Sequence, residues 1–225
     1  MRINANFGIP VGVQAGSLEW QASPMAGVDR RMLDRIGGEV ARATSIVRYA
    51  PGSHFSAHTH DGGEEFIVLE GTFQDEHGDY PAGTYVRNPV GTRHVPRSDG
   101  GCTIFVKLWQ FDPEDRAQFA LDLGELALAP VADAPGIARA ILHERVDELV
   151  LLEQWDAGTT RSFDAQGGAE LLVLEGSAEW QGHTYGKHGW IRLPAGWQCR
   201  IVAGPEGARV WIKSRHLAKL RLPPS

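Results

Sequence analysis

A four-residue motif occurs twice in this chain at a fixed separation, and this repetition restricts the possible folds more than any other feature. Val68-Leu69-Glu70-Gly71 recurs as Val173-Leu174-Glu175-Gly176, which is 105 residues later. A turn-like motif, Pro89-Val90-Gly91, recurs as Pro194-Ala195-Gly196 at the same separation of 105 residues. Because two separate landmarks share one offset, the sequence predicts a tandem duplication of one domain.

Strand-like segments dominate the chain. Segments 42–49, 65–69 and 102–108 are rich in Ile, Val, Phe, Tyr and Thr, and each is bounded by Gly, Pro or Asp. The chain contains 27 Gly and 13 Pro, a surplus of turn formers that favours many short strands over long helices. We therefore predict an all-β fold for both copies.

One segment between the copies carries helix signals. Asp112 suits the N-cap, Pro113 suits the first helical position, and acidic residues follow, so a short helix is expected over 113–121. A Pro- and Ala-rich segment at 127–136 is typical of a linker. The predicted division is a first domain at 1–112, a helix and linker at 113–136, and a second domain at 137–225.

The composition argues against several classes of function. The chain has 22 Lys+Arg against 28 Asp+Glu, a net charge of −6, and so lacks the basic stripe of a nucleic-acid-binding protein. No apolar run approaches the ~18 residues of a membrane span, and the N-terminal segment does not resemble a signal peptide. Two cysteines, Cys102 and Cys199, are too few for a disulfide framework. We expect a cytoplasmic protein with no nucleic-acid or membrane partner.

Four potential metal ligands lie in the first copy. The pattern is Gly52-x5-His58-Thr59-His60-x3-Glu64-x6-Gly71, followed by Gly83-x5-Pro89-Val90-Gly91-x2-His94. Residues two apart on a strand face the same side, so His58 and His60 can present both imidazoles to one point. Glu64 begins the next strand and His94 follows a second turn. Three imidazoles and one carboxylate suit a divalent first-row metal ion.

The neighbouring Glu65 competes with Glu64 for the role of fourth ligand. Only Glu64 has the six-residue spacing to Gly71, and strand parity turns Glu65 toward the opposite face. We therefore assign the ligand role to Glu64.

This paired spacing resembles the two signature motifs of the cupin superfamily, whose members are double-stranded β-helices, or jelly rolls. Residues 62–94 more closely resemble the cupin domain of ChrR-type anti-sigma factors, a resemblance that extends over roughly 10–112. One departure is Ser98, where the second motif usually ends in Asn. The resemblance implies a tandem jelly roll (a bicupin) with a short connecting helix. It also implies zinc at the site, whereas more distant cupins similar to acetylacetone dioxygenase use iron.

The second copy has lost these ligands. The 105-residue offset places Phe163, Ala165, Ala169 and Cys199 at the positions of the four ligands. A single thiol among apolar residues is more often a small buried hydrophobe than a ligand. We therefore expect a degenerate second domain without metal, which covers the first domain, extends a sheet or holds a dimer together.

Three further residues are candidates for lining the pocket around the metal. His54 lies four residues before His58 and shares its face if the strand is regular. Tyr85 and Arg87 alternate along one strand and are placed in the same pocket, although strand twist and bulges affect which way they face. No separate general base is evident, so the catalytic residues stay unassigned.

Three functions are consistent with such a site. The first is an oxygenase-type enzyme acting on a small carbonyl or diketone-like substrate. The second is a sensory or regulatory module, as the ChrR resemblance implies. A sigma factor is possible as a partner but not favoured, because the sigma-binding zinc segment of those proteins contains cysteines and this chain has none before Cys102. The third is a purely structural zinc site.

The expected cofactor is one divalent metal ion per chain. Zinc or iron is favoured, and manganese or nickel would also suit these ligands. The expected partners are a small-molecule ligand or substrate and a second copy of the chain in a homodimer.

Overall fold

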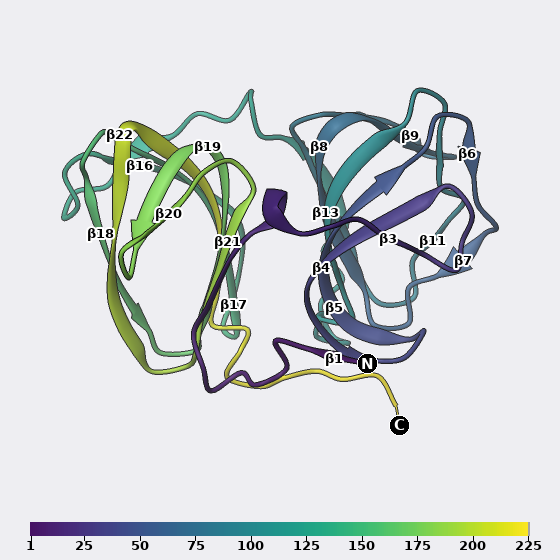
Figure 1. The fold of residues 1–225 in the computed structure, drawn as a ribbon, viewed down its shortest axis with the longest axis horizontal. Coiled ribbons are helices and arrows are strands. Elements are labelled where there is room, and N and C mark those ends of the chain that lie inside the picture. The colour runs from purple at the N-terminus through teal and green to yellow at the C-terminus, as the bar shows by residue number, and fades with distance from the viewer. Residues whose placement is uncertain (225) are drawn as a thin grey trace. The chain divides into compact units, whose positions relative to one another are not determined.

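The structure is a computed structural model that describes residues 1–224. The chain consists of two compact units, which Figure 1 shows as two groups of strands. The first unit contains residues 1–5, 19–125 and 221–225, and the second contains residues 6–18 and 126–220. Antiparallel strands make up nearly all of the regular structure, so the predicted all-β jelly-roll fold is confirmed.

The first unit is built around one large antiparallel sheet with the strand order β1-β4-β5-β13-β8-β10-β14. Its strands are β1 (Arg2–Ile3), β4 (Val28–Gly37), β5 (Ala41–Tyr49), β13 (Cys102–Leu108), β8 (Glu64–Asp75), β10 (Thr84–Asn88) and β14 (Phe119–Asp122). Short strands extend or face this sheet: β3 (Gln21–Ala22), β6 (Ser53–His54), β7 (His58–Thr59), β9 (Gly78–Pro81), β11 (Arg93–His94) and β12 (Arg97–Ser98).

Alternation along these strands creates the core of the first unit. On β8, Phe66 and Val68 point inward, and on β13, Ile104 and Val106 do the same. Because successive strand residues face opposite sides, one face of the sheet becomes apolar, and it forms a core with Phe73 against which Phe55 and Tyr80 pack. This inward face ends at Glu64, the first residue of β8, so the alternation itself places that carboxylate at the edge of the core.

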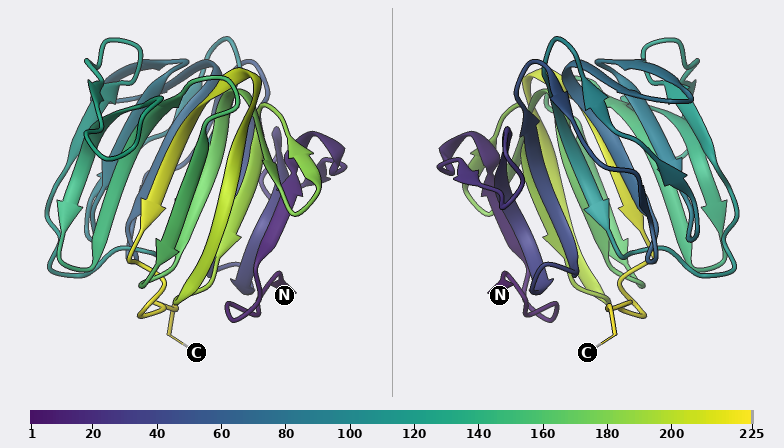
Figure 2. Two further views of the ribbon diagram at one scale, coloured as in Figure 1. Left: turned by 90° about the vertical axis from the view of Figure 1, so that its left-hand side faces the viewer. Right: turned by 90° about the vertical axis from the view of Figure 1, so that its right-hand side faces the viewer.

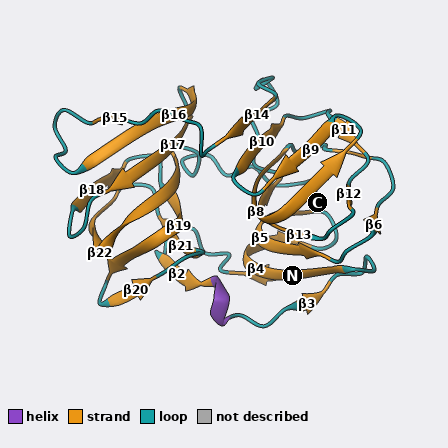
Figure 3. Ribbon diagram, turned by 90° about the horizontal axis from the view of Figure 1, so that it is seen from above, coloured by secondary structure: helices purple, strands orange, loops and turns teal. Residues whose placement is uncertain are grey.

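The second unit repeats this plan with the strand order β15-β16-β17-β22-β19-β21-β2. Its strands are β15 (Ala129–Pro130), β16 (Ile137–Arg145), β17 (Glu148–Trp155), β18 (Thr160–Ala165), β19 (Ala169–Trp180), β20 (His183–Tyr185), β21 (Gly189–Leu193), β22 (Trp197–Ser214) and β2 (Val11–Gln14). The large strands lie side by side in Figure 2. β2 is followed by a single 3-10 turn, Ala15–Ser17, which is purple in Figure 3.

The 105-residue offset of the sequence reappears in the strands. β8 and β19 each have 12 residues and begin at Glu64 and Ala169, 105 residues apart. Gly71 and Gly176 sit at the same place in these strands with φ of 70° and 68°. A Cβ at Gly71 would lie 2.2 Å from the carbonyl oxygen of Gly101, and one at Gly176 would lie 2.1 Å from that of Gly207. Each repeat therefore requires glycine at this position.

The structure corrects the prediction of a helix over 113–121. Only a turn follows Pro113, and residues Phe119–Asp122 form β14, which pairs with β10. The observed units also differ from the predicted division at 1–112, 113–136 and 137–225. Residues 6–18 belong to the second unit, residues 113–125 and 221–225 belong to the first, and the second unit resumes at 126. Among the described residues, no helix is long and apolar enough to cross a membrane.

Candidate metal centre

A two-stranded ladder brings the three histidines of the motif together. β7 pairs with β11 so that His58 lies opposite His94. His60 follows β7, where its backbone N–H donates to the carbonyl oxygen of Thr92 at 2.9 Å. The ring centroids lie 5.1 Å apart for His58 and His60, 4.9 Å for His58 and His94, and 4.6 Å for His60 and His94. The predicted pairing of imidazoles from two segments is therefore present in the structure.

The carboxylate of Glu64 points at this group of imidazoles. Its Oε2 lies 3.4 Å from Nε2 of His60 and 3.8 Å from Nε2 of His94. The same oxygen is buried and has no hydrogen-bond partner among the described residues. A buried carboxylate oxygen without a donor is costly, so this arrangement calls for a cation.

The residues present fit a metal ion. Nε2 of His60 and Nε2 of His94 are 3.2 Å apart. Two metal–nitrogen bonds of about 2.0–2.1 Å separate their nitrogens by about 2.9–3.4 Å, depending on the angle between them. One ligand atom from each of the three histidines lies within 4.8 Å of the others. Three imidazole nitrogens and one carboxylate oxygen form a donor set that suits zinc, iron, manganese or nickel.

Each imidazole is also held from its far side. Nδ1 of His58 lies 3.2 Å from the carbonyl oxygen of Ser56, and Nδ1 of His60 lies 3.1 Å from Oγ1 of Thr92. Nδ1 of His94 lies 3.2 Å from Oδ2 of Asp75. With the proton on Nδ1 in each ring, all three donate to an oxygen and leave the lone pair of Nε2 facing the centre. Such partners fix the tautomer and orientation of metal-binding histidines.

Asp75, the acceptor for His94, also accepts hydrogen bonds from other groups. Besides the bond from His94, its Oδ1 accepts hydrogen bonds from the backbone N–H of His77 at 2.8 Å and of Gly78 at 3.2 Å, and from the hydroxyl of Tyr80 at 3.2 Å. Burial alone would raise the pKa of Asp75, but the bonds from His94 and His77 outweigh it and lower that pKa. The carboxylate therefore stays ionised beside His94.

The protonation of the histidines follows from the same contacts. Burial lowers the pKa of His60, and the neighbouring imidazoles lower it further against the opposing effect of Glu64. Burial also acts to lower the pKa of His94, but its hydrogen bond to Asp75 and the charge of Glu64 outweigh this and raise it. The uncharged form of His60, which a metal ion requires, is therefore favoured by the site itself.

A cavity of about 350 Å³ opens onto this centre. His58, His60 and Glu64 form part of its wall, and the apolar side chains of the core form much of the rest. Arg30 and Tyr49 also line it. The sequence interpretation did not include these two residues. Strand alternation provided a signal for Tyr49, because it lies two residues after the core residue Val47 on β5.

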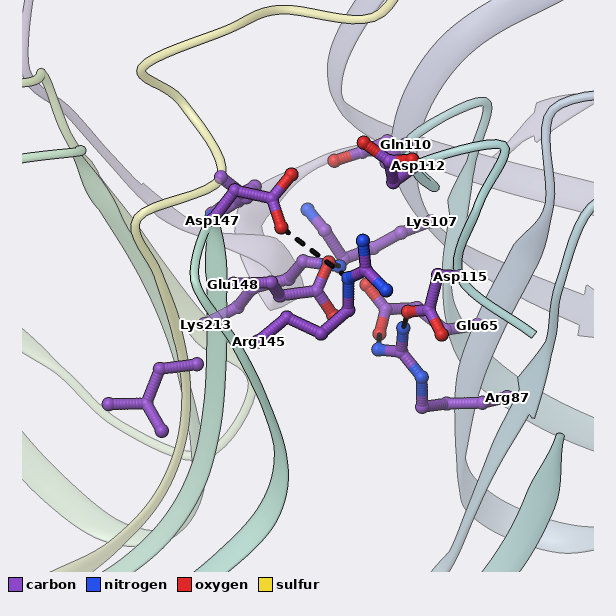
Figure 4. Close-up of polar contacts among 12 residues, drawn as sticks. Glu65, Arg87, Lys107, Gln110, Asp112, Asp115, Arg145, Asp147, Glu148 and Lys213 are labelled. Atoms are coloured by element: carbon purple, nitrogen blue, oxygen red, sulfur yellow. Dashed lines mark hydrogen bonds and ion pairs between the residues drawn. The ribbon is translucent and has the colours of Figure 1, made fainter. Parts of the chain in front are cut away.

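Tyr85 and Arg87, predicted to line the pocket, lie elsewhere. Both lie on β10 and contact Glu65 of β8, which faces away from Glu64. Oε2 of Glu65 accepts hydrogen bonds from the hydroxyl of Tyr85 at 2.7 Å and from Arg87 at 3.1 Å. Figure 4 shows Arg87 between the carboxylates of Glu65 and Asp115, the latter at 2.8 Å. All four side chains are buried, and none lines the cavity at the metal centre. The choice of Glu64 over Glu65 agrees with this geometry.

His54, the third predicted pocket residue, is also outside the cavity. It ends β6, pairs with Arg97 of β12 and is exposed. Asp75 was not predicted, and no local pattern indicates it, because it is brought to His94 by the far end of the 12-residue strand β8.

The second unit has an apolar cluster at the corresponding place. Phe163, Ala165 and Ala169 belong to its hydrophobic core, and Cys199 packs against that core. Phe163 pairs with Cys199 along the continuous strands β18 and β22, where the first unit has the separate short strands of the histidines. The side chains at these positions contribute packing.

Comparison with known structures identifies the class of fold. A candidate dioxygenase from Nostoc punctiforme superimposes with a TM-score of 0.74 at 14% identity, over 97% of this chain and 87% of that chain. Bacillus subtilis oxalate decarboxylase, described with Mn(II) centres, gives 0.62 at 12% identity over 91% and 76%. The pirin YhhW from Escherichia coli, solved with nickel(II), gives 0.63 at 12% identity over 92% and 98%. No curated protein matches the sequence.

These likenesses show that the chain has the cupin fold. Residues 10–112 match the family model of the ChrR Cupin-like domain. The metal-ligand motif of the first unit lies entirely within the matched residues.

Proposed function

We propose that His58, His60, Glu64 and His94 bind one divalent metal ion, and that the protein is an oxygenase-type enzyme acting on a small carbonyl or diketone-like compound. The observation that carries the proposal is the buried Oε2 of Glu64, which has no hydrogen-bond partner in residues 1–224 and lies 3.4 Å from Nε2 of His60. The resemblance of the fold to a candidate dioxygenase supports the reaction class.

The bound metal would supply Lewis-acid chemistry and, as iron, a place for O₂ to react. The chain's own residues prepare the surroundings. His60 and His94 are only 6% and 3% exposed, whereas His58 is exposed and lies on the side open to solvent. The apolar wall of the cavity excludes water from a bound substrate and strengthens its electrostatic contacts. Asp75 holds His94 in one orientation through its hydrogen bond.

Metal analysis tests the binding step. Protein purified without added metal should carry about one divalent ion per chain, as expected for a single site, measured by inductively coupled plasma mass spectrometry. His60→Ala should lose this ion, whereas His77→Ala, which changes an exposed turn residue, should keep it. A wild-type protein that neither carries nor takes up a divalent ion would overturn the proposal.

Oxygen consumption tests the reaction. Iron-loaded wild-type protein should consume O₂ together with pentane-2,4-dione or a related β-diketone, and His60→Ala should not. Metal binding without turnover of such compounds would support the metal site but reject the proposed oxygenase activity. Metal loss that only lowers the melting temperature would identify a structural zinc site.

A sensory module is the second candidate, and the match of residues 10–112 to the ChrR Cupin-like domain favours it. In this case a ligand or oxidant at the metal would change the binding of a partner protein without any turnover. Stoichiometric capture of a sigma factor by the purified chain would support this function, and its loss in His60→Ala would connect it to the metal.

A further inference from the structure

Arg30 brings a positive charge to the inner side of the first unit. Its neighbours on β4 face outward: Asp29 forms an ion pair with Arg48 at 2.7 Å, and Arg31 lies over the ring of Trp20 at 4.2 Å. Strand alternation turns Arg30 to the opposite side, the side of the core residue Val28. Arg30 lines the cavity at the metal centre.

The guanidinium of Arg30 has no protein partner in the part of the chain that the structure describes. Among residues 1–224, no carboxylate oxygen lies within 4.0 Å of its nitrogens, and none of its N–H groups donates a hydrogen bond. Besides Glu64, the acidic residues of the cavity wall are Glu39 and Asp61, and both are exposed. A half-buried guanidinium with no protein partner is available to a ligand, and a carboxylate can pair with it in a bidentate manner.

Tyr49 supplies a hydrogen-bond donor in the same cavity. Its ring is fixed by edge-on contacts with Phe55 at 5.2 Å and Phe73 at 5.9 Å. Its hydroxyl makes no hydrogen bond within residues 1–224. Burial raises the pKa of Tyr49 far above its ordinary value, the charge of Glu64 adds to this effect, and Arg30 opposes it. The hydroxyl therefore keeps its proton and can donate it to an oxygen atom in a hydrogen bond.

We propose that the cavity binds a small monocarboxylic acid with an apolar body, whose carboxylate pairs with Arg30 and whose other polar end accepts a hydrogen bond from Tyr49 beside the metal centre. The position of the second polar end beside the metal rests on the proposed function. The pairing of the carboxylate with Arg30 does not require a metal.

The size and lining of the cavity define the substrate class further. A volume of about 350 Å³ is at the lower end of small-molecule pockets, which span about 300–1,000 Å³. Val28, Val47 and Val106 line it, so an aliphatic or aromatic body is favoured between the two polar ends. A substrate with several charges would leave some of them unpaired against this wall.

Matched pairs of ligands test the role of Arg30. The probes are butyrate and benzoate, each compared with its neutral amide, butyramide and benzamide. Dissociation constants are measured by ligand-observed NMR with the full chain, once metal-free and once loaded with zinc. Wild-type protein should bind each acid roughly tenfold or more tightly than its amide, as a charge-assisted hydrogen bond implies. Arg30→Gln should remove this preference in both forms, and Arg30→Lys should restore part of it.

Arg31→Gln is the control, because it changes the neighbouring arginine on the outer face and should leave the preference for acid over amide unchanged.

Tyr49→Phe should weaken binding of 2-oxo acids such as 2-oxobutyrate more than that of butyrate, because only the 2-oxo acids have a keto oxygen besides the carboxylate. Equal affinity for acid and amide, or equal behaviour of Arg30→Gln and Arg31→Gln, would overturn the proposal. If the preference for acid over amide appears only with zinc and is retained in Arg30→Gln, the carboxylate binds the metal. That result would also overturn the proposal. Arg30-dependent binding in a protein that takes up no metal would support it while rejecting the proposed function.

Discussion

Oδ2 of Asp75 lies 3.2 Å from Nδ1 of His94, while Nε2 of the same ring lies 3.2 Å from Nε2 of His60. One imidazole thus connects a buried carboxylate to the candidate metal centre. The carboxylate holds the proton on Nδ1 and makes Nε2 a better electron donor. Asp75 is therefore a positioning residue for the metal site.

Asp75→Asn should weaken divalent metal binding by roughly 10- to 100-fold, the usual effect of losing such a partner. The measurement is isothermal titration of metal-free protein with zinc. Asp133→Asn, an exposed aspartate of the second unit, is the control and should bind as wild type does. Unchanged zinc affinity in Asp75→Asn, with an unchanged metal-free melting temperature, would remove Asp75 from the site.

Glu64→Gln should abolish the stabilisation that metal binding provides. Wild-type protein at a metal concentration of 100 times Kd should gain about 2.7 kcal/mol in unfolding free energy. Without metal, the variant should be at least as stable as wild type, because the lost charge was on a buried oxygen with no donor among residues 1–224. Glu70→Gln, an exposed change on the same strand, should retain the full metal effect in thermal denaturation. A metal-dependent shift of equal size in Glu64→Gln and Glu70→Gln would show that Glu64 is not a ligand.

The clustering of the candidate metal ligands was predictable because their arrangement is local. His58 lies on β7, His60 directly follows that strand, and Glu64 begins the next strand on the face that its parity dictates. Tyr85 and Arg87 were misplaced, because their side depends on the register that pairs Arg87 with Glu65 across two strands. No short-range pattern contains that register.

The remaining errors have a common physical cause. Asp112 and Pro113 are good local helix signals, but pairing of residues 119–122 with β10 determines the structure of the segment that follows them. β2 pairs with β21, almost 180 residues later in the chain, and so residues 6–18 join the second unit. Tertiary pairing overrides weak local propensity in both places.

Gly71 and Gly176 allow a test of the steric requirement for glycine in the two repeats. Gly71→Ala should destabilise the protein by more than the ~1–2 kcal/mol that a left-handed backbone conformation costs an alanine. The excess arises because the new Cβ would lie 2.2 Å from the carbonyl oxygen of Gly101. Gly52→Ala isolates the conformational cost, since Gly52 has φ of 74° and open space around it. Urea denaturation measures both variants.

The same comparison applies to the second repeat, with Gly176→Ala against Gly158→Ala, which has φ of 70° and open space. The excess cost should be similar in both repeats. Equal stability of the two variants within either pair would contradict a steric requirement for glycine at this position.

Arg87→Met separates fold stability from metal binding. Arg87 is fully buried and its guanidinium contacts the carboxylates of Glu65 and Asp115. Breaking a buried ion pair from one side costs about 3–5 kcal/mol, which urea denaturation should detect. Zinc affinity should stay within about twofold of wild type, because these side chains lie on the face of β8 opposite Glu64. A large loss of zinc affinity in folded Arg87→Met would place this network in the metal site after all.

The two cysteines should differ in their reaction with iodoacetamide. Burial raises the pKa of both thiols, and Cys102 is only 5% exposed, whereas Cys199 is half-buried. Because the thiolate is the reactive form, modification of Cys199 should rise with pH along a curve displaced above that of a free cysteine. Cys102 should react only after denaturation. Mass spectrometry of tryptic peptides, after labelling at several pH values between about 7 and 10, reports both sites in one sample. Rapid labelling of Cys102 in the native protein at neutral pH would contradict its place in the core of the first unit.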